Sequence, residues 1–297
     1  MIYNLGSINI DHIYSVPHFP APGETLLSNS YFKGLGGKGA NQSIAIARAG
    51  GQVAHIGAIG DDALWARDKL AAAGVDVSGI TVLESPTGHA IINVDPGGEN
   101  NIVLFEGANV RVVERQISAA LAKASPGDWF LLQNEVNNGA YAARLAQDMG
   151  LKVAYVAAPF DAEKLREILP FVDLLSANEG ETMMACQALG LPEDDIPVES
   201  LLITRGGQGS SYRDGDQRYF QPIFPVEPVD TTGAGDTFMG YFIAQLDVGK
   251  TPQQALRMAA AAAALKVTKK GTAQAIPLLQ EVTEFIRSSP PKSSSPG

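Results

Sequence analysis

The sequence contains a single cysteine, Cys186, so no disulfide bond can form within the chain. Its few histidines are also too scattered to match the ligand spacing of a zinc site; they are His12, His18, His55 and His89. Unpaired thiols are typical of proteins in reducing compartments. We therefore expect a cytoplasmic protein that has neither a disulfide framework nor a structural zinc ion.

Basic residues are scarce as well. Lys and Arg number 22 against 32 Asp and Glu, which gives a formal net charge of -10. Surfaces that bind nucleic acids or anionic membranes need clustered Lys and Arg, so we expect neither partner. A small phosphorylated ligand is still compatible with this charge, because backbone N–H groups can bind an anion locally.

Long hydrophobic runs are absent too. The stretch Met1–Ile8 lacks the basic region that opens a signal peptide, and no run reaches the roughly 18 apolar residues of a membrane-spanning helix. Short apolar runs alternate instead with helix-like segments, which predicts βαβ units in a three-layer α/β sandwich. The predicted strands cover residues 2–8, 52–59, 129–133, 153–157, 174–177 and 201–204, and the predicted helices cover residues 40–49, 63–73, 114–124, 140–149 and 163–169.

Two stretches break this alternation. Residues 18–33 and 88–106 resemble β-hairpins, and the second has P-G-G-E-N at its tip between two segments of alternating polarity. We expect them to form a small separate sheet that covers one side of the main domain. The low-complexity segment S-S-P-P-K-S-S-S-P-G from Ser288 predicts a disordered tail over residues 290–297.

The glycine-rich segment G-L-G-G-K-G-A-N-Q spans Gly34 to Gln42 and precedes a predicted helix. Gly34, Gly36 and Gly39 match the G-x-G-x-x-G pattern of a dinucleotide-binding turn, and acids follow about 20 residues later. A glycine-rich hairpin end with a helix cap explains the same residues equally well. The segment is not a Walker A loop, because Lys38 is followed by glycine rather than by Ser or Thr.

A second segment, D-T-T-G-A-G-D-T-F-M-G from Asp230 to Gly240, leads into a helix predicted over residues 236–246. Gly233 and Gly235 allow a tight turn that leaves the first N–H groups of the helix free to bind an anion. Asp236 could simply favour the helix N-terminus, an effect of about 0.3–1 kcal/mol. An acid in an anion-binding turn would repel the anion, however, unless it removes the proton from a hydroxyl group that attacks a phosphoryl group. The segment therefore predicts phosphoryl transfer with Asp236 as the general base.

Together these segments resemble the two signatures of the ribokinase family, the PfkB-type carbohydrate kinases. Further short motifs occur in family order: G-S-I-N-I-D-H near the N-terminus, N-E-G-E at 178–181, T-R-G-G-Q-G at 204–209, and K-G-T-A-Q-A-I-P near the C-terminus. The resemblance covers nearly the whole chain. It implies a ribokinase-like three-layer α/β/α sandwich over residues 1–289, with a small β-sheet lid whose strands lie within about residues 10–36 and 87–107.

The resemblance also implies roles for individual residues. Asp236 would be the general base, and the turn through Gly233, Ala234 and Gly235 would present the N–H groups of Ala234, Gly235 and Asp236 as an anion hole. The positions that match the family's sugar contacts are Asn9, Asp11, Gly37, Lys38, Asn41, Glu135 and Asp236. Those that match its nucleotide site are Asn178, Thr204, Gly206, Gly207, Gly209 and Gly235. Taken singly, most of these short motifs have an ordinary explanation as a strand end, a hairpin turn or a helix N-terminus.

Two metal ions are implied as well. Glu181 matches a residue that positions magnesium, in part through water. A potassium ion beside the anion hole would order the turn and thereby raise the rate. The residues expected to bind this potassium ion, mostly through their backbone carbonyl groups, are Asp230, Thr232, Lys266, Lys269, Gly271 and Ala275. Ala275 stands where family members often have a serine, whose hydroxyl could add a ligand. The lysines also make this segment positive, which disfavours a bound cation. A helix that ends at a glycine would explain the same segment without an ion.

The resemblance thus implies an ATP-dependent sugar kinase that transfers the γ-phosphoryl group to a primary hydroxyl, the 5-hydroxyl in the case of ribose. Apolar lid residues such as Ile91, Ile92 and Val94 predict a homodimer that forms through the lid. Three alternatives stay open: a kinase for another sugar or a nucleoside, an NAD-dependent oxidoreductase built on Gly34–Gly39, and a sugar-binding regulator on the kinase fold. The intact Asp236 and its glycines disfavour the regulator.

Overall fold

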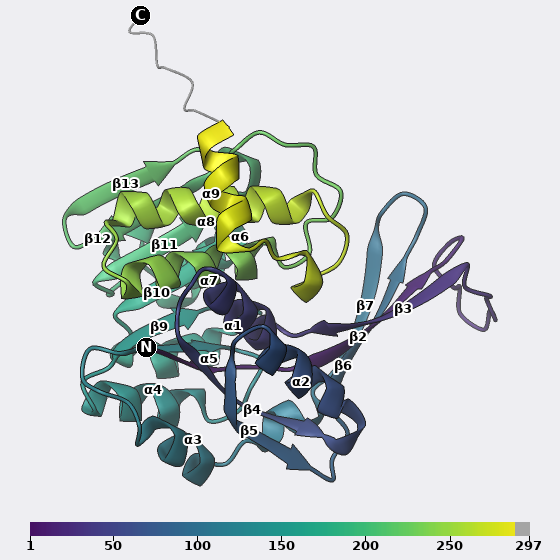
Figure 1. Cartoon of the computed structure of the whole chain (residues 1–297), viewed down its shortest axis with the longest axis horizontal. Coiled ribbons are helices and arrows are strands. Elements are labelled where there is room, and N and C mark those ends of the chain that lie inside the picture. Colours follow the sequence, from purple (N-terminus) through teal and green to yellow (C-terminus); the bar gives the residue numbers. More distant parts are fainter. Residues whose placement is uncertain (289–297) are drawn as a thin grey trace, which may run out of the picture.

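The computed structural model describes residues 1–288, so the predicted tail at 290–297 lies outside the described residues. The chain forms a nine-stranded sheet with the order β13-β12-β11-β10-β9-β8-β1-β4-β5 and a four-stranded sheet with the order β3-β2-β6-β7 (Figure 1). The large sheet consists of β1 (Ile2–Leu5), β4 (Val53–Gly60), β5 (Asp76–Leu83), β8 (Trp129–Gln133), β9 (Lys152–Val156), β10 (Leu174–Asn178), β11 (Ser200–Thr204), β12 (Ser210–Asp214) and β13 (Gln217–Gln221). The small sheet consists of β2 (Asn9–Ser15), β3 (Ser30–Gly36), β6 (Gly88–Val94) and β7 (Asn100–Phe105).

Helices cover both faces of the large sheet, which confirms the predicted three layers. Side chains on β8 show why: Leu131 points into one hydrophobic core, whereas Phe130 and Leu132 point into the other. The first core is covered by α1 (Lys38–Arg48), α2 (Leu64–Ala72), α7 (Ala234–Asp247), α8 (Pro252–Val267) and α9 (Leu279–Ser288). The second core is covered by α3 (Glu114–Leu121), α4 (Gly139–Asp148), α5 (Ala162–Ile168) and α6 (Glu179–Leu189).

The strands from β11 to β5 in the sheet order run parallel, and β12 and β13 extend one edge as antiparallel strands. Every predicted strand of the large sheet is present, although the predicted strand at 2–8 is divided: β1 ends at Leu5, and the chain enters the small sheet at Asn9. The edge strand β5 was not predicted. Its residues are exposed or partly buried except for Ile80, so it lacks the continuous apolar run by which the central strands were predicted.

The small sheet projects from one side of the molecule (Figure 1). The predicted hairpin at 88–106 is formed by β6 and β7. The predicted hairpin at 18–33 is wrong in its first strand: β3 pairs with β2 at 9–15, and residues 18–29 form the connection. Prolines at positions 20 and 22 explain the difference, because proline cannot donate to a strand ladder.

The candidate site lies where the parallel strands end. The carboxyl ends of parallel strands meet at one edge of a sheet, and ligands of α/β proteins bind there. Polar segments follow β1, β8, β10 and β11 at this edge, and the small sheet continues from β1. Among residues 1–288, no helix combines the length and the hydropathy that crossing a membrane requires.

Candidate active site

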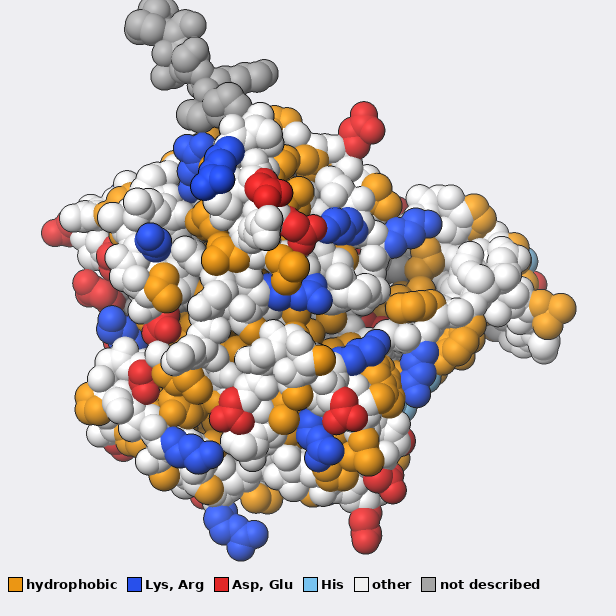
Figure 2. Space-filling view, in the orientation of Figure 1, with side chains coloured by type: hydrophobic (Ala, Val, Ile, Leu, Met, Phe, Trp, Pro, Cys, Tyr) orange, Lys and Arg blue, Asp and Glu red, His pale blue; other side chains and the backbone are white. Residues whose placement is uncertain are grey.

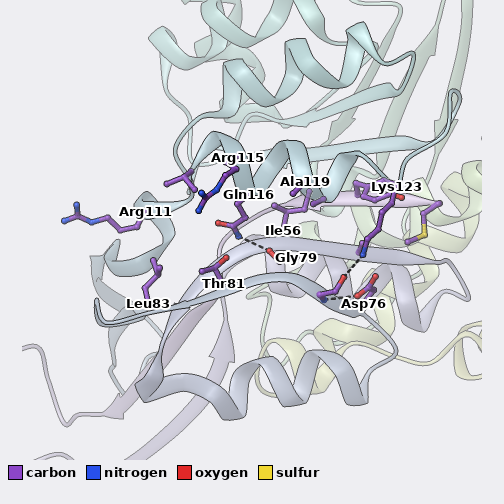
Figure 3. Close-up of a pocket in the computed structure, with 16 residues that line it drawn as sticks. Ile56, Asp76, Gly79, Thr81, Leu83, Arg111, Arg115, Gln116, Ala119 and Lys123 are labelled. Atoms are coloured by element: carbon purple, nitrogen blue, oxygen red, sulfur yellow. Dashed lines mark hydrogen bonds between the residues drawn. The ribbon is translucent and has the colours of Figure 1, made fainter.

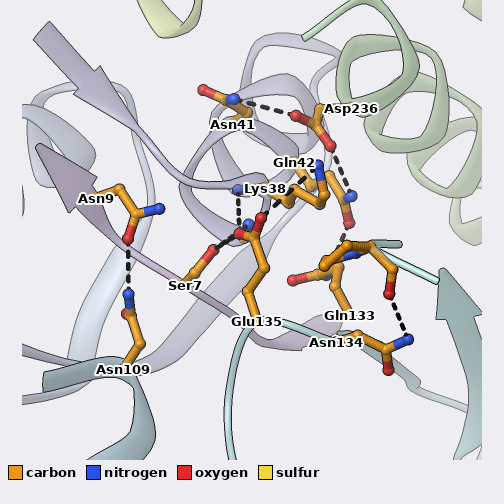
Figure 4. Close-up of polar contacts among 12 residues, drawn as sticks. Ser7, Asn9, Lys38, Asn41, Gln42, Asn109, Gln133, Asn134, Glu135 and Asp236 are labelled. Carbon is orange, nitrogen blue, oxygen red and sulfur yellow. Dashed lines mark hydrogen bonds and ion pairs between the residues drawn. The ribbon is translucent and has the colours of Figure 1, made fainter. Parts of the chain in front are cut away.

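Asp236 lies in the first turn of α7, where this helix packs against α1. The helices approach so closely at Gly240 that a Cβ atom there would lie 2.4 Å from Ala45 Cβ. The contact brings the polar end of α1 to Asp236. Asn41 Nδ2 donates to Asp236 Oδ2 at 3.0 Å, and Gln42 Nε2 donates to Asp236 Oδ1 at 3.0 Å (Figure 4). Amide donors therefore hold both carboxylate oxygens.

Burial raises the pKa of Asp236 above its ordinary value, because a charge is poorly solvated there. The charge of Lys38 and the hydrogen bonds from Gln42 and Asn41 oppose this shift, and the charge of Glu135 adds to it. A raised pKa brings the carboxyl group closer to the range in which a general base works best at neutral pH. The surroundings of Asp236 therefore suit proton removal from a hydroxyl group.

Lys38 and Glu135 form a second polar contact beside Asp236 (Figure 4). Lys38 Nζ lies 3.7 Å from Glu135 Oε1, and the Lys38 backbone N–H donates to Glu135 Oε2 at 3.1 Å. Ser7 Oγ forms a hydrogen bond with the same Oε2 atom. Burial alone would lower the pKa of Lys38, but the charges of Asp236, Glu135 and Glu181 outweigh it and raise the pKa. The Lys38 ammonium group thus lies in a field of three carboxylates.

Asn9 and Asp11 are nearly buried on β2, with exposed fractions of 4% and 6%. Asn109 Nδ2 donates to Asn9 Oδ1 at 2.7 Å, which leaves the amide nitrogen of Asn9 to donate to a ligand. Gly36 is needed beside them, because a Cβ atom there would lie 2.1 Å from Asp11 Oδ2. Asp11 also feels the charges of Glu135 and Asp236. The predicted sugar contacts on β2, at the start of α1 and after β8 therefore belong to one site.

Burial raises the pKa of Asp11 from 3.8 to about 7, and the charge of Glu135 adds to the shift. Only the ionised carboxylate accepts hydrogen bonds from a polyol with both oxygens. We expect kcat/KM for the sugar to increase as the pH rises through about 7 and then to level off, because this parameter reports ionisations of the free enzyme. Initial rates at low sugar concentration between pH 5.5 and pH 9 would measure it.

The control for this prediction is Asp11→Asn, which should lower kcat/KM and remove the rise near neutral pH. The raised pKa also has a stability consequence. The folded state favours the protonated carboxyl group, so this group's contribution to the free energy of unfolding is lost as the pH rises from 3.8 to about 7. Above neutral pH, the Asp11→Asn protein without sugar should therefore have the higher Tm. A kcat/KM that is flat across neutral pH would contradict the assignment.

The turn before α7 presents N–H groups to open space. Gly233 adopts a left-handed conformation with a φ of 74°, and an added Cβ atom at Gly235 would meet nothing within 4 Å. Of the three predicted donors, the Ala234 N–H is engaged by the Thr231 carbonyl at 3.1 Å. Among residues 1–288, no backbone hydrogen bond outside regular elements uses the N–H groups of Gly235 or Asp236. These two groups are the better candidates for binding an anion.

Two adjoining cavities open at this helix end. A polar cavity of about 180 Å³ is lined by Lys38, Asn178, Glu181, Asp236 and the turn before α7. A mostly apolar cavity of about 350 Å³ continues from it and is lined by the predicted residues Thr204, Gly206, Gly207 and Gly209. Both share the residues Thr204, Thr231, Ala234, Gly235 and Phe238. The arrangement suits a ligand with an anionic end and a flat apolar end.

Asn178 and Glu181 form a reciprocal capping box at the start of α6. The Glu181 N–H donates to Asn178 Oδ1 at 2.8 Å, and the Asn178 N–H donates to Glu181 Oε2 at 2.8 Å. The ordinary helix-cap explanation therefore holds for both residues, although both also line the polar cavity. Within the described part of the chain, no group of three or more His, Cys, Asp or Glu side chains could hold a metal ion.

The two segments expected to bind potassium, around Asp230 and at residues 266–275, are joined directly by hydrogen bonds. Lys266 Nζ donates to the Asp230 carbonyl oxygen at 2.8 Å. The Asp230 carboxylate accepts from the N–H groups of Thr232 at 2.9 Å and Gly271 at 2.8 Å. Burial lowers the pKa of Lys266, and the charges of Asp230 and Asp236 oppose this shift. A cationic side chain that donates to the Asp230 carbonyl oxygen does not fit a potassium ion bound at the same oxygen.

Comparisons with known proteins decide the family. The family described as pfkB family carbohydrate kinase matches residues 1–279. A ribokinase from Haemophilus influenzae is 40% identical over 299 residues, which cover 95% of this chain and 97% of the relative. The chain belongs to the pfkB family of carbohydrate kinases. It is therefore a phosphotransferase with a sugar hydroxyl as acceptor.

Solved structures of two ribokinases agree with this assignment. The structure of a Cryptococcus neoformans ribokinase in complex with ADP has a TM-score of 0.83 at 34% identity and covers 96% of this chain and 98% of that chain. The structure of an Arabidopsis thaliana ribokinase complexed with ribose and ATP has a TM-score of 0.81 at 28% identity and covers 96% of this chain and 97% of that chain. The predicted ribokinase-like fold is confirmed.

The alternative of an NAD-dependent oxidoreductase fails on geometry. A dinucleotide-binding turn joins a parallel strand of the central sheet to a helix. Gly34 and Gly36 lie instead on β3, which is an antiparallel strand of the small sheet. Gly39 is required for packing. A Cβ atom there would lie 2.4 Å from Gly6 Cα, so only glycine lets α1 pack this closely against the end of β1. The glycine-rich segment therefore joins the small sheet to α1, and its role as a sugar contact stays a prediction.

Sequence reasoning missed a chain of buried polar side chains that starts far from Asp236. His55 Nε2 lies 3.1 Å from the Gly6 carbonyl oxygen, which can only accept a hydrogen bond. Burial lowers the pKa of His55 to about 4, so its ring is neutral at neutral pH and carries its hydrogen on Nε2. His55 Nδ1 therefore accepts, and Ser43 Oγ donates to it at 2.9 Å.

The same series of hydrogen bonds continues to Asp236. Asn4 Nδ2 donates to Ser43 Oγ at 2.8 Å, so Asn4 Oδ1 accepts from Gln133 Nε2 at 2.9 Å. Gln133 Nε2 also donates to Gln42 Oε1 at 2.8 Å. Because its oxygen is engaged, Gln42 turns its amide nitrogen to Asp236. The chain thus orients every amide so that Gln42 is a donor.

Another cavity, of about 720 Å³, lies between α3 and β5 and away from this site (Figure 3). Gln116 reaches from α3 into its wall and donates to the carbonyl groups of Gly57 at 2.6 Å and Gly79 at 2.9 Å. None of the predicted site residues lines it. Its size alone therefore does not make it the candidate active site, which we place where the polar side chains around Asp236 converge.

Proposed function

We propose that this protein is an ATP-dependent ribose kinase, which converts ribose and ATP to ribose 5-phosphate and ADP. The observation that carries the proposal is the position of Asp236. Its carboxylate is held by α1 beside the predicted sugar-contact residues, and it lines the polar cavity at the start of α7. The ribokinase from Haemophilus influenzae and the Arabidopsis thaliana ribokinase complexed with ribose and ATP support the choice of substrates.

In the proposed reaction, Asp236 takes the proton of the sugar hydroxyl while the hydroxyl oxygen bonds to the γ-phosphorus of ATP. The bond from this phosphorus to the β–γ bridging oxygen breaks, and ADP leaves with the electron pair. The N–H groups of Gly235 and Asp236 stabilise the charge on the transferred group. Asn9 and Asp11 orient the sugar hydroxyls, and Lys38 supplies positive charge beside Asp236.

Glu181 fits a role in positioning magnesium. It lines the polar cavity, and only its Oε2 atom has a hydrogen-bond partner among residues 1–288. A magnesium ion bound with ATP would neutralise phosphate charge, and it usually keeps several water molecules. The free Oε1 atom of Glu181 can accept a hydrogen bond from such a water molecule, so a cage of protein carboxylates is not needed.

The substrate assignment is tested by ADP release over a panel of pentoses, hexoses and nucleosides. We expect the highest kcat/KM with ribose, because two relatives at 40% and 34% identity over 95% of this chain are ribokinases. Phosphorus NMR of the product should show a phosphate ester at the 5-hydroxyl. Preference for another sugar or for a nucleoside would reassign the substrate while keeping the kinase activity, and an absence of ADP release with every acceptor would overturn the proposal.

We also propose that the small sheet acts as a lid over the sugar. Its strands β2 and β3 carry Asn9, Asp11 and Gly36 at the site, and its far end projects away (Figure 1). Closure would keep out the water that would otherwise receive the phosphoryl group. Shortening the tip around Gly97 and Gly98 should raise the sugar KM and the rate of sugar-independent ATP hydrolysis. Unchanged values for both would remove the sheet from the mechanism.

The exposed strand β7 supports a homodimer formed through this lid. Ile102, Val103, Leu104 and Phe105 are 48–60% exposed, and Figure 2 shows hydrophobic side chains on the projecting part. An edge strand with such side chains is a ready surface for pairing with another chain. We expect light scattering to show a dimer and Val103→Lys to shift it toward the monomer. A monomeric wild-type protein at working concentrations would contradict the dimer.

A further inference from the structure

The place expected for a monovalent cation holds a cationic side chain of the protein. Lys266 lies in the last turn of α8, and its side chain is 0% exposed. Its Nζ atom lies 2.8 Å from the Asp230 carbonyl oxygen and 3.9 Å from Asp230 Oδ1. Both atoms belong to the residue at which the turn before α7 begins. The ammonium group therefore lies at two oxygen atoms of Asp230, one of the residues expected to bind the potassium ion.

Other groups that would bind a cation are engaged as well. The Lys266 carbonyl oxygen accepts from the Lys269 N–H at 3.0 Å. The Asp230 carboxylate accepts from the N–H groups of Thr232 and Gly271. Ala275 is buried and has no side-chain oxygen. A potassium ion would have to displace these hydrogen bonds and would be repelled by a buried ammonium group. We therefore expect this place to have little affinity for potassium.

The same contacts connect the two segments without any ion. The Val267 carbonyl accepts from the Asp230 N–H at 3.0 Å and from the Val229 N–H at 2.7 Å, and Asp230 Oδ2 reaches the Gly271 N–H at 2.8 Å. Together with the Lys266 contact, these hydrogen bonds fix the N–H, carbonyl and carboxylate groups of Asp230. The next residues form the turn whose N–H groups face the polar cavity. Order at Asp230 is therefore transmitted directly to the catalytic turn.

We propose that the ammonium group of Lys266 is a built-in monovalent cation, which orders the turn from Asp230 to Gly235 and makes catalysis independent of potassium. An ammonium group resembles potassium in charge and size, and that of Lys266 donates to the Asp230 carbonyl oxygen, which would otherwise be free to coordinate the ion. Lys266 is a positioning residue, because it acts on the phosphoryl group only through this turn. The inference rests on the proposed kinase function.

The first experiment needs no variant. The kcat of the wild-type protein is measured in potassium, cesium, sodium and tetraethylammonium chloride at constant ionic strength. We expect the four values to agree within about twofold, because the cation is covalently attached. A kcat that rises several-fold and saturates with potassium would overturn the proposal.

The second experiment removes the charge with Lys266→Met, whose apolar chain fits the buried stem. In tetraethylammonium we expect kcat to fall by about 10-fold or more, because the N–H donors of the turn lose their alignment. Potassium or ammonium ions should restore much of the rate. Lys270→Met is the matched control: it removes an exposed lysine from the same segment, and its kcat should stay unchanged and independent of the salt. Wild-type kcat of Lys266→Met in all four salts would contradict the proposal.

Thermal unfolding provides a readout that does not depend on the reaction. The Tm of Lys266→Met should be higher in potassium or ammonium than in tetraethylammonium, whereas the Tm of the wild-type protein should not differ between these salts. Equal Tm values of the variant in all salts would oppose a vacated cation site. If the protein proves not to be a kinase, this comparison still decides whether Lys266 occupies such a site. If Lys266→Met does not fold, the wild-type salt series decides alone.

Discussion

Asp236→Asn is expected to lower kcat by about 10²- to 10⁴-fold, which is the usual contribution of a general base. The amide keeps the size of the side chain but cannot take the hydroxyl proton. Affinities for sugar and ATP should change little, because Asp11, Asn9 and the cavity beside α7 are untouched. The comparison requires kcat from ADP release and dissociation constants for both ligands from calorimetry.

Asp247→Asn is the matched control for this prediction. Asp247 is the last residue of α7, and its carboxylate lies 3.1 Å from the N-terminal ammonium group of Met1. The control thus makes the same chemical change in the same helix, away from the turn. Its kcat should equal that of the wild-type protein. Wild-type kcat in a folded Asp236→Asn protein would refute the role of Asp236 as the general base.

The parts of the site that sequence could predict are those encoded locally. Gly233 and Gly235 precede a helix and so reveal an anion-binding turn, and Asp236 follows within the same few residues. The layers of the fold could be predicted for the same reason. The apolar run of each buried strand and the periodicity of each helix can be recognised within a short segment of the sequence. The start of α7 lies at Ala234, two residues before the predicted start, since the turn itself forms the helix N-terminus.

The parts that could not be predicted depend on contacts between distant segments. Gln42 is the last residue of the glycine-rich segment Gly34–Gln42, but only the packing of α1 against α7 places its side chain at Asp236. Asn109 orients Asn9 across 100 residues of sequence. The lysine at position 266 indicated local positive charge, yet nothing in the sequence shows that its side chain turns inward to the Asp230 carbonyl.

Removal of the Gln42 amide is the second change from which we expect a large decrease in kcat. In Gln42→Leu, Asp236 loses one of its two amide donors, and a hydrogen bond to a charged group contributes about 1.5–3 kcal/mol. We expect kcat to fall by about 10- to 100-fold with little change in KM, because Gln42 acts on the sugar through Asp236. Gln245→Leu is the matched control: this buried amide of α7 donates to the Ala49 carbonyl at 3.1 Å, and its loss should leave kcat unchanged.

The pH profile of kcat separates positioning from a general loss of structure. A hydrogen bond to the carboxylate lowers the pKa of Asp236, so its removal raises that pKa, and the acidic limb of kcat should move to higher pH in Gln42→Leu. The charges that face this region stay the same in the variant; they are Lys38 on α1, Glu135 after β8, Glu181 on α6, Lys266 on α8 and Asp11 on β2. An unshifted limb with a lowered kcat would indicate structural damage instead.

Gln133 tests whether the buried chain sets the orientation of Gln42. In Gln133→Leu, Gln42 Oε1 loses its donor, so the amide of Gln42 can rotate and present its oxygen to Asp236 for part of the time. We expect a decrease in kcat and a shift of the acidic limb in the same direction as in Gln42→Leu, but smaller. If Gln133 affects Asp236 through its hydrogen bond to Gln42, the double variant should have the same kcat as Gln42→Leu alone. Effects that multiply in the double variant would show instead that the two residues act independently.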